Sequence, residues 1–125
     1  MKQTIYTAKA PRPAGPYSQG VITSGRTLYI AGQGPADPVT GRIPEGVEAQ
    51  ITRCLENVKA IVEAAGASMA DVIKVNAYLK DMAHFPIYNE IYRRYFPEPY
   101  PARTTVQSDL PNFLIEIDAI VALPG

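Results

Sequence analysis

Two acidic residues near the C-terminal end of the chain, Glu116 and Asp118, have the spacing of side chains that share one face of a β-strand. They alternate with Ile115, Ile117 and Ala119, which point to the opposite face. A carboxylate held on a rigid strand can orient a water molecule or transfer a proton. A strand with one face in solvent has the same pattern, so both interpretations stay open.

A single arginine, Arg103, stands where the proline-rich segment 97–101 gives way to the strand-forming residues Thr104–Val106. The prolines restrict the backbone, so we expect this side chain to be held in a defined position. A guanidinium offers paired donors that match the two oxygens of a carboxylate, which makes Arg103 a candidate for binding a carboxylate-bearing substrate. A solvent-exposed arginine at the start of a strand is the alternative, and the local sequence does not decide between them.

Two glycine-containing segments hold further candidates. Tyr17, in Gly15–Gln19, carries a hydroxyl that can cover and hydrogen-bond a small ligand, although packing in the core is the simpler interpretation. The segment Gly32–Pro35 lacks the Lys-Ser/Thr ending of a phosphate-binding loop, and no helix begins directly after it. Donation of a hydrogen bond from the Gly32 backbone N–H to a substrate oxygen is the role that stays open.

Other reactive residue types are explained more simply by structural roles. Cys54 is the only cysteine and His84 the only histidine, so a metal site within one chain would lack ligands, and we expect none. We also expect an inert thiol, because Cys54 lies beside the apolar stripe of a helix. An aromatic series at helical spacing is typical of a core face rather than a stacking platform; it comprises Tyr88, Ile91, Tyr92 and Tyr95.

Length and charge narrow the class of protein. The chain has 125 residues, which predicts one domain spanning residues 1–125. Twelve Lys and Arg residues balance twelve Asp and Glu residues, so the sequence predicts neither a nucleic-acid partner nor binding to a membrane surface. The sequence contains no apolar run of transmembrane length and no signal-peptide pattern, and we expect a soluble, cytoplasmic protein.

The hydrophobic pattern predicts the elements that position these residues. Apolar residues at three- and four-residue steps predict helices over 47–65 and 85–96. Strand-forming residues predict a hairpin over 21–32 and strands over 72–79, from 104 and over 114–123. This order indicates an α+β fold in which two helices cover one face of a sheet. The other face would be apolar and uncovered, which predicts self-association.

Short motifs spread over nearly the whole chain form a specific combination: Ala10-Pro11, Gly15-Pro16-Tyr17-Ser18-Gln19, Ala31-Gly32-Gln33, Asp37-Pro38, Thr40-Gly41, Gln50, Asn57-Val58-Lys59-Ala60-Ile61, Lys80-Asp81-Met82, Asn89-Glu90, Tyr95-Phe96, Pro101-Ala102-Arg103 and Ile115-Glu116-Ile117. In this order they resemble the reactive intermediate deaminase (RidA) family, also called the YjgF family. The resemblance implies a chorismate-mutase-like α+β fold and a homotrimer, with the sheets forming a central barrel and ligand clefts between subunits. It also implies a cofactor-free 2-iminobutanoate/2-iminopropanoate deaminase, which hydrolyses 2-imino or 2-enamino acids released by pyridoxal-phosphate enzymes to 2-oxo acids and ammonia.

The resemblance also assigns roles to individual residues. Arg103 corresponds to the family arginine that binds the substrate carboxylate, and Glu116 corresponds to the acid that positions the attacking water. The positions that line the cleft or hold the ligand correspond to Tyr17, Gly32, Asn89 and Thr105. Thr105 stands where some members have Cys, which favours attack by water over a cysteine nucleophile. Ala31 stands where some members have Ser, and Gly34 replaces the usual aliphatic residue, which can alter the width of the cleft.

Two other functions compete with the deaminase. The same cleft residues would serve a non-catalytic protein that binds small carboxylates such as 2-oxobutyrate and signals to a partner protein. Some relatives carry the label of a nuclease or translation inhibitor, against which the zero net charge and the lack of a basic stripe argue. Sequence does not decide between catalysis and binding.

Overall fold

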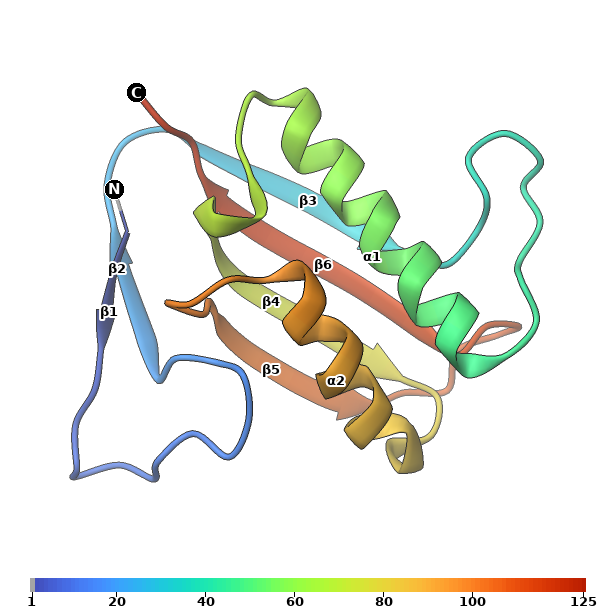
Figure 1. Ribbon diagram of the computed structural model, residues 1–125, viewed down its shortest axis with the longest axis horizontal. Coiled ribbons are helices and arrows are strands. Elements are labelled where there is room, and N and C mark those ends of the chain that lie inside the picture. The colour runs from blue at the N-terminus through green and yellow to red at the C-terminus, as the bar shows by residue number, and fades with distance from the viewer. Residues whose placement is uncertain (1) are drawn as a thin grey trace.

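The computed structural model describes residues 2–125 and is built around a four-stranded mixed sheet in the order β3-β6-β4-β5 (Figure 1). Strands β3 and β4 both pair antiparallel with β6, and β4 pairs parallel with β5. A second, two-stranded sheet joins β1 to β2. The elements are β1 (Lys2–Ile5), β2 (Gly20–Thr23), β3 (Thr27–Gln33), α1 (Val47–Ala64), β4 (Val72–Leu79), α2 (Phe85–Tyr95), β5 (Ala102–Gln107) and β6 (Ile115–Ala122).

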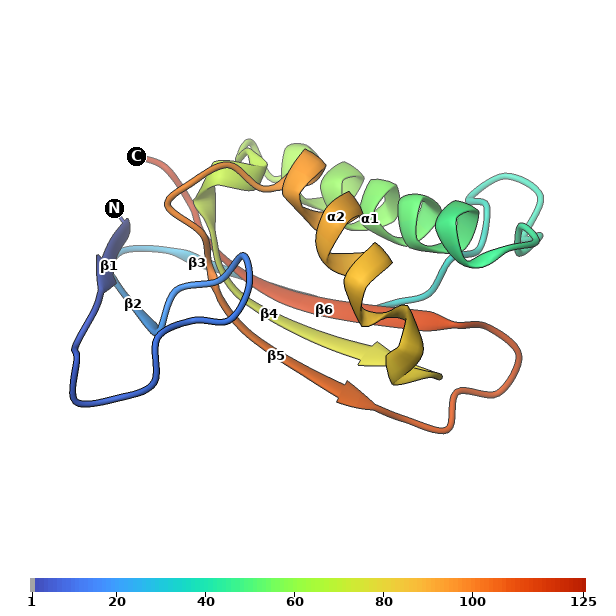
Figure 2. The same ribbon diagram turned by 60° about the horizontal axis from the view of Figure 1, so that its bottom comes forward.

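Both helices lie on the same face of the four-stranded sheet, as Figure 2 shows from the side. Helix α1 buries its apolar stripe against the sheet, and the stripe includes Ile51, Leu55, Val58 and Val62. The helix ends where Gly66 takes a φ of 82°, a left-handed conformation that glycine adopts without steric cost. The predicted α+β arrangement, with two helices over one sheet face, is therefore confirmed.

Alternation along the strands separates the two faces of the sheet. In β6, Ile115, Ile117 and Ala119 are buried under the helices, while Glu116 and Asp118 point to the uncovered face, as the sequence predicts. The core also takes in α2, whose Tyr88, Ile91 and Tyr92 are fully buried. The aromatic series of this helix thus packs in the core, with Tyr95 at its edge.

The predicted hairpin over residues 21–32 is wrong. Strands β2 and β3 are consecutive in the chain, but β2 pairs with β1 and β3 pairs with β6. Gly25, with a φ of 92°, lies between the two strands, and the chain passes there from one sheet to the other. The sequence gives little indication of β1, because Lys2–Ile5 is short and alternates between half-buried and exposed residues.

The uncovered face of the sheet is more polar than its strand sequences suggest. Near its centre, the Asp118 carboxylate accepts hydrogen bonds from Asn76 Nδ2 at 2.8 Å and from Tyr78 Oη at 3.1 Å. Because that bond holds the phenol proton, Asp118 raises the pKa of Tyr78, with burial adding to the effect. Large apolar side chains are exposed on this face at Tyr29, which is 74% accessible, and at Val106. Self-association there would thus cover a mixed surface rather than a purely apolar one.

We predict that Gly66→Ala lowers the free energy of unfolding by about 1 kcal/mol, because alanine is strained at a positive φ. An added Cβ at Gly66 meets no atom within 4 Å, so the cost arises from the backbone alone. Urea unfolding at a fixed protein concentration measures it. Gly20→Ala is the matched control: Gly20 lies outside the positive-φ region, and its added Cβ would lie 4.0 Å from Ile5 Cβ. Equal effects of the two substitutions would contradict the assigned role of Gly66.

Candidate active site

Arg103 enters the space between β5 and α2, where its side chain is only 9% exposed. Four aromatic rings surround its guanidinium, whose Cζ lies 4.7–5.5 Å from the ring centroids. These rings belong to Tyr17, Phe85, Tyr88 and Tyr92. Cation–π attraction and burial together fix the position of the charge. The exposed alternative for Arg103 is therefore excluded.

A bare glycine lies beside the outer edge of this guanidinium. A Cβ placed on Gly15 would lie 3.3 Å from Arg103 Nη2, 3.6 Å from Asn89 Nδ2 and 3.7 Å from the Tyr17 ring. Two nitrogen donors therefore face the small space that a side chain at Gly15 would fill. A carboxylate oxygen in this space would accept hydrogen bonds from both donors.

The segment that carries Tyr17 is fastened to the chain just before Arg103. The Ser18 backbone N–H donates to the Pro101 carbonyl at 2.9 Å, and Ser18 Oγ donates to the Tyr100 carbonyl. The Tyr17 hydroxyl accepts from the Ala14 N–H at 3.2 Å, which orients the ring. Ser18 therefore has a structural role, and its hydroxyl is committed to the backbone.

Polar atoms that are buried without a hydrogen-bond partner cluster around Arg103. They are Arg103 Nη1, Tyr88 Oη, Tyr92 Oη, Asn89 Oδ1 and Thr105 Oγ1; within residues 2–125, His84 Nδ1 is the remaining buried side-chain atom without a partner, and it is not counted in this cluster. Buried polar groups are normally paired, so such a concentration at one place indicates a site that completes its hydrogen bonds with a ligand or water. Thr105 belongs to this cluster because it lies two residues after Arg103 on β5 and points to the same face.

Glu116 forms a second cluster with Gly32 on the uncovered face of the sheet. A Cβ placed on Gly32 would lie 3.0 Å from Glu116 Cδ, and still nearer to its carboxylate, so a side chain at position 32 would displace the carboxylate from this position. The β3–β6 register shifts between Ile30 and Gln33, which places Gly32 at an irregular point of the strand. Among the described residues, the Glu116 carboxylate takes part in no hydrogen bond or ion pair.

The two clusters lie on opposite faces of the sheet within one chain. Val75 of β4 pairs with Arg103 on one side and with Ala119 on the other, and all three point toward the helices. Glu116 is three residues before Ala119 and therefore points away from them. The strands that carry Arg103 and Glu116 are separated by β4, or roughly 10 Å. One chain brings Arg103, Tyr17, Asn89 and Thr105 together but leaves Glu116 and Gly32 apart.

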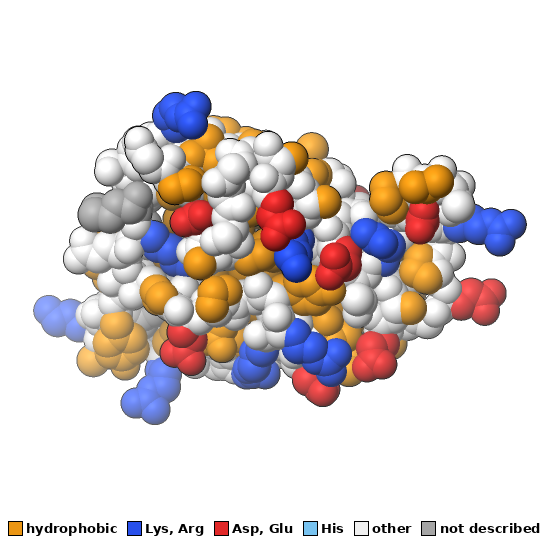
Figure 3. Space-filling model, turned by 45° about the horizontal axis from the view of Figure 1, so that its top comes forward, with side chains coloured by type: hydrophobic (Ala, Val, Ile, Leu, Met, Phe, Trp, Pro, Cys, Tyr) orange, Lys and Arg blue, Asp and Glu red, His pale blue; other side chains and the backbone are white. Residues whose placement is uncertain are grey.

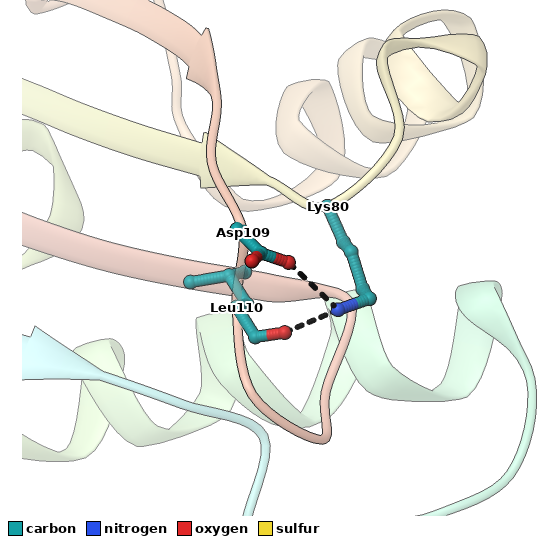
Figure 4. A network of polar contacts seen from close by, with 3 residues as sticks. All are labelled: Lys80, Asp109 and Leu110. Atoms are coloured by element: carbon teal, nitrogen blue, oxygen red, sulfur yellow. Dashed lines mark hydrogen bonds and ion pairs between the residues drawn. The ribbon is translucent and has the colours of Figure 1, made fainter.

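The loop before β6, which sets the position of Glu116, is held by two side chains. Gln50 Oε1 accepts from the Leu114 N–H at 2.8 Å, and Gln50 Nε2 donates to the Pro44 carbonyl at 3.0 Å. At the end of β4, Lys80 Nζ donates to the Leu110 carbonyl and lies 3.6 Å from Asp109 Oδ1 (Figure 4). Glu116 thus extends from a strand whose entry is fixed on both sides.

Metal and thiol chemistry find no support in the side-chain arrangement. The described part of the chain has no group of three or more His, Cys, Asp or Glu side chains placed to hold a metal ion. Cys54 is fully buried on α1, and its Sγ–H donates to the Gln33 carbonyl at 3.1 Å. Burial, and after it the negative charge of Glu116, raises the pKa of the Cys54 thiol, so the reactive thiolate is disfavoured.

Sequence reasoning missed Gly15 and the aromatic surroundings of Arg103 as parts of the site. Phe85, Tyr88 and Tyr92 follow an ordinary core pattern, and nothing local indicates that their rings face a charge. Gly15 lies in a segment singled out for Tyr17, and its role depends on Asn89, which is far away in the chain. Of the four aromatic residues around Arg103, only Tyr17 could be selected from the sequence, because it combines an aromatic ring and a hydroxyl beside a turn.

The chain matches known proteins over nearly its full length. The family model described as Endoribonuclease L-PSP matches residues 7–123. A RutC family protein of Pyrococcus horikoshii is 55% identical over 123 residues, which cover 96% of this chain and 97% of the relative. A 2-iminobutanoate/2-iminopropanoate deaminase of Dermatophagoides farinae is 40% identical over 125 residues, covering 98% of this chain and 97% of the relative.

Solved structures agree with these matches. RidA from the Antarctic bacterium Psychrobacter sp. PAMC 21119 aligns with a TM-score of 0.76 and 46% identity, covering 97% of this chain and 99% of that chain. TdcF of E. coli, crystallised with bound serine, aligns with a TM-score of 0.75 and 42% identity, covering 98% of this chain and 99% of that one. No helix within residues 2–125 has the length and apolar character needed to cross a membrane.

We predict that thiol reagents label Cys54 in the native protein at least roughly 100-fold more slowly than in the unfolded chain, because labelling requires local opening. Because the raised pKa keeps the buried thiol un-ionised, labelling should proceed only from the opened state, and the ratio of the native to the unfolded rate should stay constant between about pH 7 and pH 9. The absorbance of the thiolate that the reagent releases measures the labelling rates of the native and the unfolded protein, and Cys54→Ala corrects for background. Labelling of the native protein at the unfolded rate would show that the thiol is accessible.

Proposed function

Because this chain belongs to the RidA (YjgF) family, we propose that it is a deaminase that hydrolyses 2-imino and 2-enamino acids to 2-oxo acids and ammonia. The deaminase from D. farinae supports the activity, and the serine bound by E. coli TdcF supports a small ligand that carries a carboxylate. In this chain, the observation that carries the proposal is the buried Arg103 guanidinium, whose Nη2 faces a glycine beside Asn89 Nδ2. This arrangement suits the carboxylate of a small acid.

The proposed reaction needs one bound substrate and one water. Arg103 Nη2 and Asn89 Nδ2 hold the substrate carboxylate, which fixes the adjacent C=N carbon. With the imine nitrogen protonated, Glu116 accepts a proton from water as the water oxygen bonds to the C=N carbon, and the nitrogen becomes a neutral amine. The Glu116 carboxylic acid then gives this proton to the amine nitrogen. The restored carboxylate takes the hydroxyl proton as the C=O bond forms and the C–N bond breaks, so that ammonia and the 2-oxo acid leave and Glu116 releases its proton to solvent.

We further propose that Glu116 and Gly32 act on a substrate bound by Arg103 of a neighbouring subunit. In one chain the two clusters face opposite sides of the sheet, roughly 10 Å apart along it, which is too far for one small acid to bridge. A second copy that presents its Glu116 to the Arg103 cluster completes the site. A homotrimer with three equivalent clefts is the arrangement that the family resemblance implies, and a closed ring of this kind uses the two different half-sites head to tail.

Ribonuclease activity is the second candidate, because the matching family model is described as Endoribonuclease L-PSP. RNA binding draws most of its affinity from basic residues that contact phosphates. This chain has no net charge, and on the face in Figure 3 the Lys and Arg side chains are interspersed with Asp and Glu. The charge distribution therefore favours a small-acid substrate. RNA cleavage that survives repurification and disappears in Glu116→Gln would reverse this preference.

We predict that Arg103→Ala reduces kcat/KM for 2-iminobutanoate by roughly 10- to 100-fold or more, because it removes the positive charge and the charge-assisted hydrogen bond from Nη2 to the carboxylate. Glu116→Gln keeps the shape of the side chain but removes the carboxylate that accepts the proton from water, so it should lower kcat with a smaller effect on KM. The imine is generated in place by an amino-acid oxidase, and its loss is followed directly.

Arg53→Ala is the control, because Arg53 lies on α1 and its Nε donates to Asn57 Oδ1 rather than facing either cluster. Full turnover by Arg103→Ala would refute the role, and binding of 2-oxobutyrate without any turnover would identify a binding protein.

A mixing experiment tests whether two subunits share each site. Arg103→Ala and Glu116→Gln chains are unfolded, combined in equal amounts and refolded together. If Arg103 and Glu116 come from different chains of a ring, about one quarter of the sites regain both residues, since half of the chains carry each change. If one chain supplied both residues, every site would stay defective, and the mixture would be as inactive as its components.

The matched control combines Arg103→Ala with the double variant Arg103→Ala/Glu116→Gln. No site in that mixture contains the arginine, and half of the chains also lack Glu116, so activity does not rise above the level of Arg103→Ala alone in either arrangement. Light scattering establishes that each refolded sample has the same oligomeric state. Recovery in the first mixture alone supports the shared site, and recovery in neither overturns it.

A further inference from the structure

The proposed reaction leaves one nitrogen of the Arg103 guanidinium and the buried hydroxyl groups of Tyr88 and Thr105 without a role. Nη2 lies toward Gly15 and Asn89, whereas Nη1 is buried and has no hydrogen-bond partner. The Tyr88 hydroxyl and Thr105 Oγ1 are buried and unpaired as well. Each buried polar atom that stays unpaired costs the free energy of removing it from water, so pairing these three groups with one another would stabilise the site.

The three groups lie close enough to influence one another. The Tyr88 ring centroid is 5.2 Å from Arg103 Cζ, and the Tyr88 residue has no exposed surface. Burial raises the pKa of Tyr88, so its hydroxyl keeps its proton, while Arg103 and Thr105 act on the same hydroxyl in the opposite direction. A neutral phenol can accept one hydrogen bond and donate another.

We propose that Tyr88 is a positioning residue for Arg103, with Nη1–H donating to Tyr88 Oη and the Tyr88 O–H donating to Thr105 Oγ1, both in the free protein and when a carboxylate occupies the outer edge of the guanidinium. Hydrogen bonds of this kind are often long in a free site and shorten when the ligand binds. Arginine only donates, so the Tyr88 oxygen accepts at that end, and the Tyr88 O–H remains available to donate to Thr105 Oγ1. Thr105 would then contribute its hydroxyl to Tyr88 rather than to the substrate.

This relay determines which edge of the arginine meets the ligand. A guanidinium held only by aromatic faces can rotate in its own plane, because cation–π attraction does not select one N–H over another. A hydrogen bond at Nη1 removes that freedom and leaves Nη2 directed at the space beside Gly15. Pre-organisation of this sort lowers the entropy lost on binding, so it affects ligand affinity more than the chemical step.

The proposal rests on the proposed function for its ligand, so its test begins with a measurement that needs no ligand. In protein with ¹⁵N-labelled arginine, the Nη1 protons of Arg103, assigned by their loss in Arg103→Lys, should exchange with water about tenfold faster in Tyr88→Phe than in the wild type. The dissociation constant for 2-oxobutyrate, measured by calorimetry, should rise by about tenfold. In imine turnover, KM should rise more than kcat.

Two further variants separate positioning from loss of structure. Tyr95→Phe removes a hydroxyl from the same helix, but this hydroxyl donates to Glu56 Oε2 at 2.6 Å and does not face Arg103. The substitution should therefore leave Arg103 exchange and ligand affinity unchanged. Thr105→Val should reproduce the Tyr88→Phe effects, and the double variant should be no worse than either single one, because both changes break one relay. If Tyr88→Phe does not fold, Thr105→Val carries the test.

The outcomes distinguish this proposal from the proposed function. Absence of imine turnover in the wild type would defeat the deaminase, while Arg103 exchange would still decide the role of Tyr88. Arg103 exchange that stays within twofold of the wild type in folded Tyr88→Phe or Thr105→Val would overturn the relay. Fully additive effects of the two substitutions would also overturn it, since independent hydroxyls do not form one chain.

Discussion

The alternation of side chains along a strand is the constraint on which the arrangement of this molecule depends. Because β5, β4 and β6 pair in register, Arg103 shares the helix-covered face with Val75 and Ala119, and Glu116 is forced to the uncovered face. Rotation about side-chain bonds does not move a residue to the other face. A shift of β6 by one residue would do so, but it would also turn the apolar residues of β6 out of the core. The fold therefore places Arg103 and Glu116 on opposite faces, and a small substrate that meets both, as we propose, would lie between two chains.

Burial of the Arg103 guanidinium gives the first half-site its chemical character. A buried charge is costly unless it is paired, yet none of the ion pairs within the described residues involves Arg103; those pairs join Lys80 to Asp109 and Glu90 to Arg94. Aromatic faces compensate part of this cost. A bound carboxylate would place a negative charge beside the guanidinium and so compensate the rest of the cost of burying it.

Local patterns predicted most of the fold but only part of the site. The helix over 47–65 and the strand over 72–79 were predicted to within a residue, because hydrophobic periodicity is local and strong in both. The pairing of β2 with β1 could not be predicted, since Ser24-Gly25-Arg26 suits a hairpin equally well. Arg103 and Glu116 were selected by chemistry, but their opposite faces follow from the pairing of β4 with both neighbours. The contact of Gly15 with Asn89 is likewise non-local.

The proposed pairing of half-sites also explains how a 2-imino acid would be oriented. Its carboxylate is attracted by Arg103 and repelled by Glu116, whereas its nitrogen, once protonated, is attracted by Glu116. The two charges of the substrate thus match the two charges of the site in one direction only. The 2-oxo acid product keeps the carboxylate but has lost the nitrogen, so it retains the attraction to Arg103 and loses that to Glu116. Weaker binding of product than of substrate follows from this loss, and it requires no movement of the chain.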